Sequence, residues 1–186
     1  MGGMSFSATP LDGLLTVRTC PLTDERGRFV RIYCDDEFST ATTVVRWLQS
    51  NLSRTSGRGA IRGMHFQYPP SAETKLIRCL RGRVFDVAVD VRKHSPTFLS
   101  WHGVELSADN ETMLLIPEGF AHGFQVLDDE AELLYMHSAA FSPAHDGRLR
   151  FDDPRLNITW PLPVGVVSQR DLATPLIDDT FTGVVP

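Results

Sequence analysis

Closely spaced cysteine pairs, the pattern of a signal peptide and long hydrophobic runs are all missing from this sequence of 186 residues. The three cysteines, Cys20, Cys34 and Cys79, form no C-x-x-C pair, which argues against a disulfide framework and a zinc knuckle. Each lies in a strand-like run, so we expect small buried side chains rather than nucleophiles. Residues 1–10 lack the basic and apolar regions of a signal peptide, and no apolar run approaches the roughly 20 residues that span a bilayer. We therefore expect a cytoplasmic protein that makes no membrane contact.

Positive charge is also scarce, with 18 basic against 23 acidic residues and a net charge of -5. The basic surface that coats nucleic acid or an anionic membrane is missing, so neither is expected as a partner. Lysine is nearly absent, because Lys75 and Lys93 are the only two and all other basic residues are arginines. An anionic ligand must therefore meet locally grouped arginines.

Short apolar runs that alternate with turn signals fill the chain between residues 14 and 160. In the clearest run, 83–92, every second residue from Phe85 to Val91 is apolar and the intervening positions include Asp86 and Asp90, which predicts a strand with one apolar face. Similar runs predict strands at 14–19, 28–33, 43–52, 60–66, 74–80, 101–106, 112–116, 123–127 and 131–138. About ten short strands without crossover helices indicate an all-β sandwich, jelly roll or barrel.

Few other elements are expected. A brief helix is predicted at 34–41, CDDEFSTA, and the Pro-rich tail at 161–186 is interpreted as an extended strap over the barrel. Residues 1–13 form a leader in this scheme. With 42% hydrophobic residues, the chain 1–186 is expected to form a single domain.

Polar side chains within strand-like runs mark the candidate site, because burying them is costly unless they are paired. They are Arg62, His65, Lys75, Asp86, His122 and Tyr135. A histidine such as His65 can accept a proton near neutral pH if a carboxylate holds its other ring nitrogen, but a strand histidine is more often structural. Lys75 and Tyr135 likewise have structural readings, as a strand-end lysine and a core aromatic.

A metal site has little support, since no H-x-H or H-x-x-x-H pair is present. The remaining histidines are expected at turns or on outer, solvated faces: His94, His102, His137 and His145. We therefore expect no metal.

Taken together, eight motifs resemble the dTDP-4-dehydrorhamnose 3,5-epimerase family. They are DERGRF (24–29), QSNLS (49–53), IRGMHFQ (61–67), TKLIRCLRGRVFDVAVDVRKHSPTF (74–98), IPEGFAHGF (116–124), LLYMHSAAFSPAHD (133–146), DDP (152–154) and SQRD (168–171). The resemblance implies a cupin-type double-stranded β-helix jelly roll that needs no cofactor. It also implies a homodimer in which a strand of one subunit lines the other's site, and the early runs at 14–19 and 28–33 are candidates for pairing with another chain.

The resemblance gives the catalytic candidates distinct roles on a sugar with a ketone at C4. His65 matches the general base, and Asp171 matches the acid that pairs with it. Lys75 matches the cation near the C4 oxygen, where it stabilises an enolate. Tyr135 matches the proton donor on the opposite face of the sugar.

The nucleotide half of the substrate is matched by a second set of residues. Contacts to the diphosphate or its surroundings are matched by Arg26, Arg62 and Arg170. The polar lining of the pocket is matched by Gln49, Asn51 and His122. Phe29 matches a position near the nucleotide, and Phe141 replaces a tyrosine that stacks on thymine. Arg31 stands where the family usually has a nucleotide-contacting Glu, a reversal of charge that leaves the base open.

Three alternatives to an epimerase remain at this point. One is a 3,4-ketoisomerase of the same barrel type, the second is a non-catalytic module that binds a sugar nucleotide, and the third is a metal-dependent cupin. Whether C3, C5 or both carbons react is also open.

Overall fold

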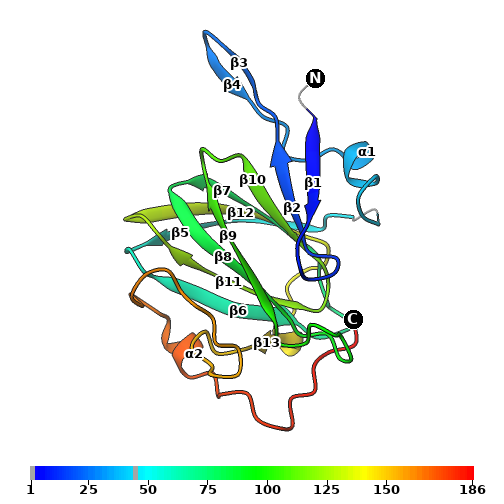
Figure 1. The fold of residues 1–186 in the computed structure, drawn as a ribbon, viewed down its shortest axis with the longest axis vertical. Helices are drawn as coiled ribbons and strands as arrows, with labels where there is room; N and C mark the ends of the chain where they lie inside the picture. Colours follow the sequence, from blue (N-terminus) through cyan, green and yellow to red (C-terminus); the bar gives the residue numbers. More distant parts are fainter. Residues whose placement is uncertain (1–2, 44–45) are drawn as a thin grey trace.

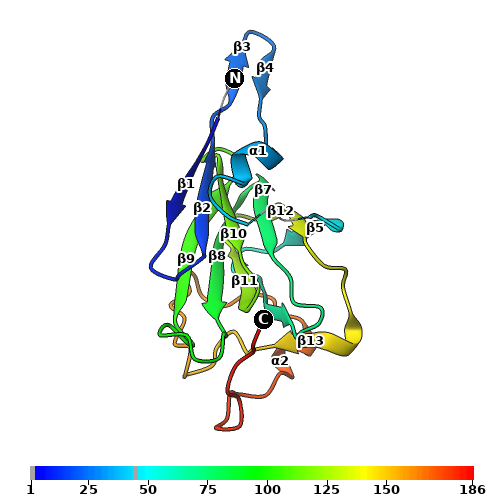
Figure 2. The same ribbon diagram turned by 90° about the vertical axis from the view of Figure 1, so that its right-hand side faces the viewer.

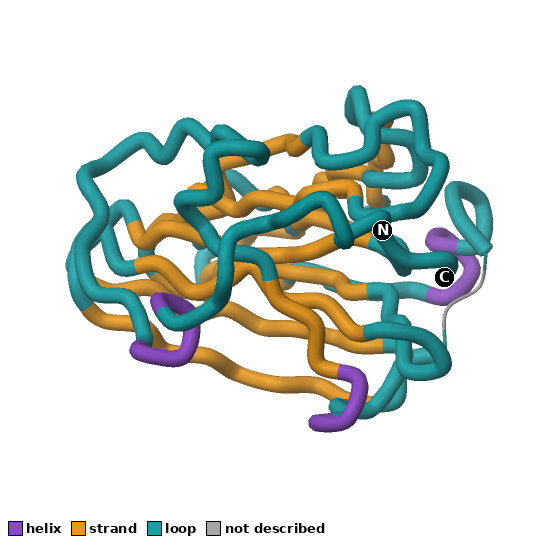
Figure 3. The backbone as a smooth tube through the Cα atoms, turned by 90° about the horizontal axis from the view of Figure 1, so that it is seen from below, coloured by secondary structure: helices purple, strands orange, loops and turns teal. Residues whose placement is uncertain are grey.

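Two antiparallel sheets face each other in the structure, a computed structural model that describes residues 3–43 and 46–186 (Figure 1). Within these residues, one sheet has the spatial order β1 (Met4–Ala8), β2 (Leu15–Thr19), β10 (Thr112–Ile116), β7 (Lys75–Arg81), β12 (Glu130–His137) and β5 (Gln49–Ser56). The other has the order β13 (Asp146–Arg148), β6 (Ile61–Gln67), β11 (Phe120–Val126), β8 (Arg83–Asp90) and β9 (Trp101–Ser107). Figure 3 shows these strands in the middle of the molecule and the loops around them.

The main core lies between the two sheets. Alternate side chains of each strand point into this space, as the two-residue period of a strand requires. Ile77 on β7 and Leu114 on β10 meet Val84 on β8 and Phe124 on β11, and all of them are at most 2% exposed. The prediction of an all-β fold built on a two-sheet core is confirmed.

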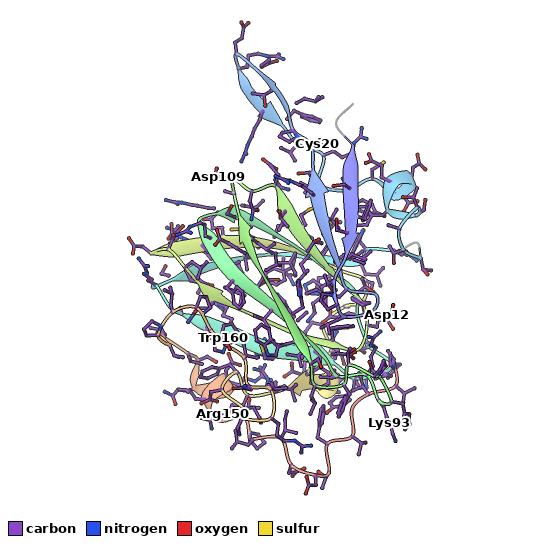
Figure 4. All side chains as sticks on the ribbon, in the orientation of Figure 1. Asp12, Cys20, Lys93, Asp109, Arg150 and Trp160 are labelled. Atoms are coloured by element: carbon purple, nitrogen blue, oxygen red, sulfur yellow. The ribbon has the colours of Figure 1, made fainter. Side chains whose placement is uncertain are left out.

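A second apolar cluster covers the outer face of the five-stranded sheet. Val87 and Val89 on β8 are fully buried there against the chain that follows β13, including Leu156 and Trp160. Figure 4 shows Trp160 beside this sheet. Asp86, on the opposite face of β8, is also fully buried. The prediction of a strand with one apolar face is confirmed, and the structure adds that both faces of β8 are buried.

The N-terminal part of the chain covers the outer face of the six-stranded sheet. Phe38 of α1 (Asp35–Phe38) packs there with Phe6, Ile32 and Tyr33. The strand predicted at 28–33 was wrong beyond Phe29, since Ile32 and Tyr33 pack against α1 instead of pairing with a neighbouring strand. Residues 3–8 of the segment interpreted as a leader include the edge strand β1, and residues 1–2 lie outside the described part.

The remaining differences concern the ends of elements. The run at 43–52 forms a strand only from Gln49, and residues 44–45 within it lie outside the described residues. The helix expected at 34–41 is shorter, at Asp35–Phe38, and the tail contains a helix of its own, α2 (Gln169–Leu172). A 3-10 turn, η1, spans Pro143–His145. None of the helices in the described ranges is long and apolar enough to cross a membrane.

A small hairpin, β3 (Leu22–Asp24) with β4 (Gly27–Phe29), projects from the body of the molecule in both ribbon views (Figures 1 and 2). Its base is held by Arg28, which binds the Glu111 carboxylate together with Arg78. Strand β2 pairs with β1 on one side and β10 on the other. The run at 14–19 is therefore not free to pair with another chain, contrary to expectation, because both of its edges are already hydrogen-bonded.

A close approach of two glycines sets the position of the central histidines. At Gly63 the backbone has a φ of 133°, and a Cβ there would lie 2.5 Å from the Cα of Gly123. Only glycine fits this contact. The contact lies between β6 and β11, where His65 and His122 are opposite each other in the register. Both imidazoles therefore lie on the same face of this sheet.

Cysteine burial follows the prediction at only one position. Cys79 is buried, and burial raises the pKa of its thiol to about 11. Cys20 is exposed and lies between β2 and the projecting hairpin (Figure 4), and Cys34 is half-buried. The expectation of buried side chains was wrong for Cys20, because it lies outside the sheets.

Candidate active site

The cavity that collects most of the predicted site residues, here called the main cavity, opens between the two sheets and has a volume of about 290 Å³. Its walls come from strands of both sheets, β5, β7 and β12 on one side and β6, β11 and β13 on the other. Several of the predicted site residues line it: Asn51, Arg62, His65, Lys75, His122, Tyr135 and Phe141. The fold thus brings together predicted side chains that the sequence distributes over five strands and a loop.

A histidine and a carboxylate form a close pair at one wall of the cavity. Nε2 of His65 lies 2.7 Å from Oδ1 of Asp171. Asp171 is on α2, where its backbone NH donates to the capping hydroxyl of Ser168. Burial by itself would raise the pKa of Asp171, but the hydrogen bond and charge of His65 and the charge of Arg148 outweigh it and hold the pKa below its ordinary value. Asp171 is therefore an anion at neutral pH, able to orient the ring.

Lys75 is held in the cavity wall by a backbone carbonyl and by a carboxylate. Its ammonium donates to the backbone carbonyl of His65 at 3.1 Å and lies 3.2 Å from Oε1 of Glu73. The other oxygen of Glu73 is 2.9 Å from Nδ1 of His137. Burial by itself would raise the pKa of Glu73, but the hydrogen bond with His137 and the charge of Lys75 lower it below its ordinary value. One carboxylate thus orders two neighbouring cationic or hydrogen-bonding side chains.

Sequence reasoning missed Glu73 and His137. His137 was expected on a solvated face, but it is buried and lines the cavity. The signal was available in the alternation of β12, because Tyr135 and His137 are two residues apart and must share a face. Their rings are nearly parallel, with an interplanar angle of 6° and centroids 5.9 Å apart.

Replacing Glu73 with alanine is expected to lower the free energy of unfolding by about 3 kcal/mol, since Lys75 and His137 would stay buried without their shared partner. Urea unfolding at pH 7 measures this loss. The pKa of Glu73 is lowered in the folded protein, so its contribution is present above the ordinary carboxyl value of about 4 and is lost as the pH falls through the lower folded value. The difference in free energy of unfolding between the wild type and Glu73→Ala should therefore become smaller at acidic pH.

The matched control is Glu132→Ala on β12. Glu132 lies 3.9 Å from Arg54, whose side chain is 60% exposed, so its removal should cost less than about 0.5 kcal/mol. Equal losses in the two variants would contradict the importance of the Glu73 network.

Tyr135 lies between two histidines. Its ring meets His122 edge-on, with centroids 5.9 Å apart, and stacks on His137 on the other side. Burial, and then the charge of Asp86, raise the pKa of the Tyr135 phenol above its ordinary value. The phenol is therefore fully protonated at neutral pH and can act only as a proton donor or a hydrogen-bonding group.

His122 makes a second histidine–carboxylate pair. Its Nε2 lies 2.8 Å from Oδ1 of Asp86, and both side chains are buried. The other oxygen of Asp86, Oδ2, is a buried atom without a hydrogen-bond partner among the described residues. A free acceptor of this kind next to the cavity can be satisfied by a hydroxyl group of a ligand.

Arginines gather where the main cavity meets a neighbouring one of about 390 Å³. Arg62, His65 and Arg148 line both cavities, and Arg170 lines the second. Arg62 donates to Thr55 at 2.8 Å, and Arg170 donates to Asp146 at 2.8 Å. Arg148 was missed by the sequence analysis, because nothing in its local pattern distinguishes it from a surface arginine. Guanidinium groups at such a junction suit a diphosphate.

The polar residues at the mouth of the cavity are held by local hydrogen bonds. Oε1 of Gln49 accepts from the backbone NH of Phe141 at 3.1 Å, and the Asn51 amide lies 3.3 Å from Nε2 of His137. The ring of Phe141 is 52% exposed. It therefore offers an open aromatic face on which a base can stack.

Four predicted residues are outside the lining of both cavities: Gln49, which binds Phe141 beside the main cavity, and three residues on or after the projecting hairpin. Arg26 and Phe29 lie on the projecting β3–β4 hairpin, where Arg26 binds Asp24 and Phe29 is 69% exposed (Figure 1). Arg31 follows the hairpin and binds Glu37 of α1 at 2.7 Å. None of the three is in the lining that the described residues form around either cavity.

The chain closely resembles proteins of known activity. The family profile described as dTDP-4-dehydrorhamnose 3,5-epimerase matches residues 8–179. A dTDP-4-dehydrorhamnose 3,5-epimerase from Shigella flexneri is 42% identical over 170 residues, which are 91% of this chain and 93% of that protein. A dTDP-4-dehydrorhamnose 3-epimerase from Streptomyces niveus is 38% identical over 178 residues, 95% of this chain and 86% of that protein.

A solved structure extends the likeness to the fold. It is the crystal structure of a dTDP-6-deoxy-D-glucose-3,5-epimerase from Legionella pneumophila Philadelphia 1 in complex with dTDP-4-keto-L-rhamnose. The TM-score is 0.90 at 36% identity, and the match covers 98% of this chain and 99% of that one. These findings confirm the resemblance and the cupin-type jelly roll, and this chain belongs to the dTDP-4-dehydrorhamnose 3,5-epimerase family.

Proposed function

We propose that this protein inverts C3, C5 or both carbons of a nucleotide-linked 4-keto-6-deoxyhexose, with dTDP-4-dehydro-6-deoxyglucose as the favoured substrate. The observation that carries the proposal is the pairing of His65 with Asp171. His65 lines the same cavity as Lys75 and Tyr135, and Asp171 contacts it from the neighbouring cavity. A base, an oriented cation and a protonated phenol are what proton abstraction beside a ketone requires.

The reaction begins with removal of a proton next to the C4 ketone. His65 takes the proton from carbon, and the electron pair of the C–H bond moves onto the C4 oxygen to form an enolate. The Lys75 ammonium stabilises the developing negative charge, a contribution of about 3 to 4 kcal/mol for a preorganised donor. Asp171 stabilises the imidazolium that forms.

The second step returns a proton to the opposite face. Tyr135 donates its phenolic proton to the same carbon, the enolate collapses to the ketone, and the configuration is inverted. Solvent then restores the protonation of both groups. The phenol suits this step because its raised pKa keeps it protonated until the enolate is present.

The nucleotide is proposed to lie along the arginine junction and the mouth of the cavity. Arg62 and Arg170 bind the diphosphate, Gln49, Asn51 and His122 provide polar contacts, and Phe141 stacks on the base. The hairpin residues Arg26, Phe29 and Arg31 reach a site only in a homodimer, where they would belong to the neighbouring subunit's site. We further propose a single-domain cytoplasmic enzyme that uses side chains alone for these steps.

The test is incubation with dTDP-4-keto-6-deoxyglucose in D2O, followed by NMR of the product. Deuterium at C3, at C5 or at both is expected, together with inversion at the labelled carbon, and the pattern identifies which carbons react. A product with the carbonyl moved to C3 would instead identify a 3,4-ketoisomerase. Binding without deuterium incorporation would contradict the proposal and indicate a sugar-nucleotide binding module.

Replacing Arg31 with glutamate is expected to change the preference between dTDP- and UDP-linked substrates by about ten-fold, with a smaller effect on kcat. The reason is that a reversed charge alters the contact of the proposed site with the base rather than with the reacting carbons. The ratio of kcat/KM for the two substrates measures it. Arg83→Glu, which breaks a surface pair with Asp128, is the control. An unchanged ratio in Arg31→Glu would exclude Arg31 from the base-binding region.

A further inference from the structure

Arg148 touches both members of the histidine–carboxylate pair. Its Nη1 lies 2.9 Å from Nε2 of His65 and 2.7 Å from Oδ1 of Asp171, while its Nε donates to Asp146 at 2.8 Å. The side chain is 18% exposed and comes from β13, which pairs with β6 so that Arg148 is opposite His65. The guanidinium is therefore a fixed part of the site rather than a mobile surface group.

The protons around these three atoms can be assigned from chemistry. A guanidinium only donates, and the ionised Asp171 only accepts. Oδ1 of Asp171 can accept from Nη1 of Arg148 and from Nε2 of His65 at the same time, because a carboxylate oxygen has more than one lone pair. The shorter contact of Nε2 with the ionised Oδ1 favours a ring proton on Nε2, and the 2.9 Å approach of Nη1 is then an unfavourable contact between two donors rather than a hydrogen bond. Nδ1 of His65 then keeps the lone pair and is the nitrogen that can take a proton from carbon.

The charges around His65 oppose one another. The charged and titratable groups around it in the two cavities are Asp171 and Arg170 from α2, Arg148 and Asp146 from β13, His122 from β11, Lys75 from β7 with Glu73 just before it, Tyr135 and His137 from β12, Arg54 from β5, and Arg62 from its own strand β6. Asp171 favours the imidazolium, whereas the guanidinium at 2.9 Å disfavours it. Arg148 also shares Oδ1, so it takes part of the carboxylate's stabilising effect away from the ring.

We propose that Arg148 is a positioning residue of this site, which holds Asp171 against His65 and keeps the imidazole neutral so that Nδ1 is free to accept a proton. The inference rests on the proposed role of His65 as the base. In the abstraction step the proton moves from the sugar carbon to Nδ1 and the electron pair moves to the C4 oxygen. Arg148 itself neither gains nor loses a proton.

The first experiment needs no substrate. The ring resonances of His65 are followed by NMR against pH in the wild type and in Arg148→Met, which keeps the length of the side chain but removes the charge. We expect the midpoint of the His65 titration to rise by about one pH unit in the variant, because Asp171 then acts on the ring alone. Arg148→Lys, which keeps the charge, should move the midpoint less than half as far.

The control is Arg150→Met. Arg150 lies two residues further along the chain and binds Asp152 at the surface, so the same charge is lost without a contact to the pair (Figure 4). The His65 midpoint should stay at its wild-type value in this variant. A midpoint that is unchanged or lower in Arg148→Met would overturn the proposal, since the guanidinium would then not oppose ring protonation. If Arg148→Met does not fold, Arg148→Gln, which also removes the charge, is read by the same criterion.

A second experiment links the effect to turnover. In Arg148→Met, the acidic limb of the pH profile of deuterium exchange should move to higher pH by the same amount as the His65 titration. One pH unit below the wild-type limb, the exchange rate of the variant should then be about ten-fold lower than that of the wild type. A displaced titration without any exchange in the wild type would refute the proposed function and leave the charge assignment intact. If the wild type exchanges deuterium but neither the His65 titration nor the acidic limb is displaced in Arg148→Met, only the role of Arg148 is refuted and the proposed function stands.

Discussion

Replacing His65 with alanine is expected to reduce deuterium exchange at the sugar carbons by about a thousand-fold, within the range for loss of a general base. The physical reason is that the ring is the group held by a buried carboxylate, at 2.7 Å from Asp171, in the wall of the cavity that also contains Lys75. NMR in D2O measures the exchange rate directly, before and apart from net inversion.

Loss of the ring must be distinguished from loss of the fold. His102→Ala on β9 is the matched control, because His102 is half-buried in the same sheet but is not in the lining of the main cavity. The His102→Ala variant should exchange deuterium into the sugar at the wild-type rate. Normal exchange in His65→Ala, with the circular dichroism of both variants unchanged, would exclude His65 as the base.

Replacing Tyr135 with phenylalanine is expected to separate exchange from inversion. His65 can still remove a proton and return one to the same face, so deuterium should enter the sugar with retained configuration. Net inversion should fall by about a hundred-fold, because the donor on the other face is gone. The ratio of inverted to retained product, read by NMR at C3 and C5, measures the effect.

Tyr68→Phe provides the control for the hydroxyl group. Burial raises the pKa of Tyr68 as well, and its phenol is not in the lining of the cavity. It should leave the ratio unchanged. A Tyr135→Phe enzyme that inverts the sugar at the wild-type rate would require a different donor, and His122 with its partner Asp86 would be the first group to replace.

The local sequence pattern predicted most of the strands, but it predicted few of the contacts between elements that are distant in the sequence. The period-two runs at β6, β7 and β12 identified strands within one or two residues, because alternation of side chains is a property of neighbouring residues. The same reasoning failed at 28–33. Ile32 and Tyr33 look like strand residues, but they pack under α1 in a cluster that only the folded N-terminal segment creates.

The tail illustrates a second limit. Alternation predicted one apolar face for the strand that carries Asp86 and Asp90, and in β8 both faces are buried. The outer one is covered by residues that follow β13, and the inner one pairs Asp86 with His122. No window of sequence around β8 contains either partner, so local pattern could not show that both faces are buried.

The site was reached mainly through the family resemblance. His65, Lys75 and Tyr135 each had a plausible structural reading on their own, and their motifs placed them in one set with Asp171. Glu73, His137 and Arg148 belong to no such motif role, so they escaped attention although each contacts that set or its partners. Their assigned roles remain predictions for the variants described above.

By itself, the sequence determined an all-β chain with strongly patterned strands, scarce positive charge and a motif set of one epimerase family. Only the tertiary structure decided which polar groups meet, because His65 and Asp171 are 106 residues apart and Arg148 lies 83 residues from His65. Contacts over such separations depend on strand register and on where the tail docks. Periodicity and composition encode strand register only weakly, and they do not encode where the tail docks.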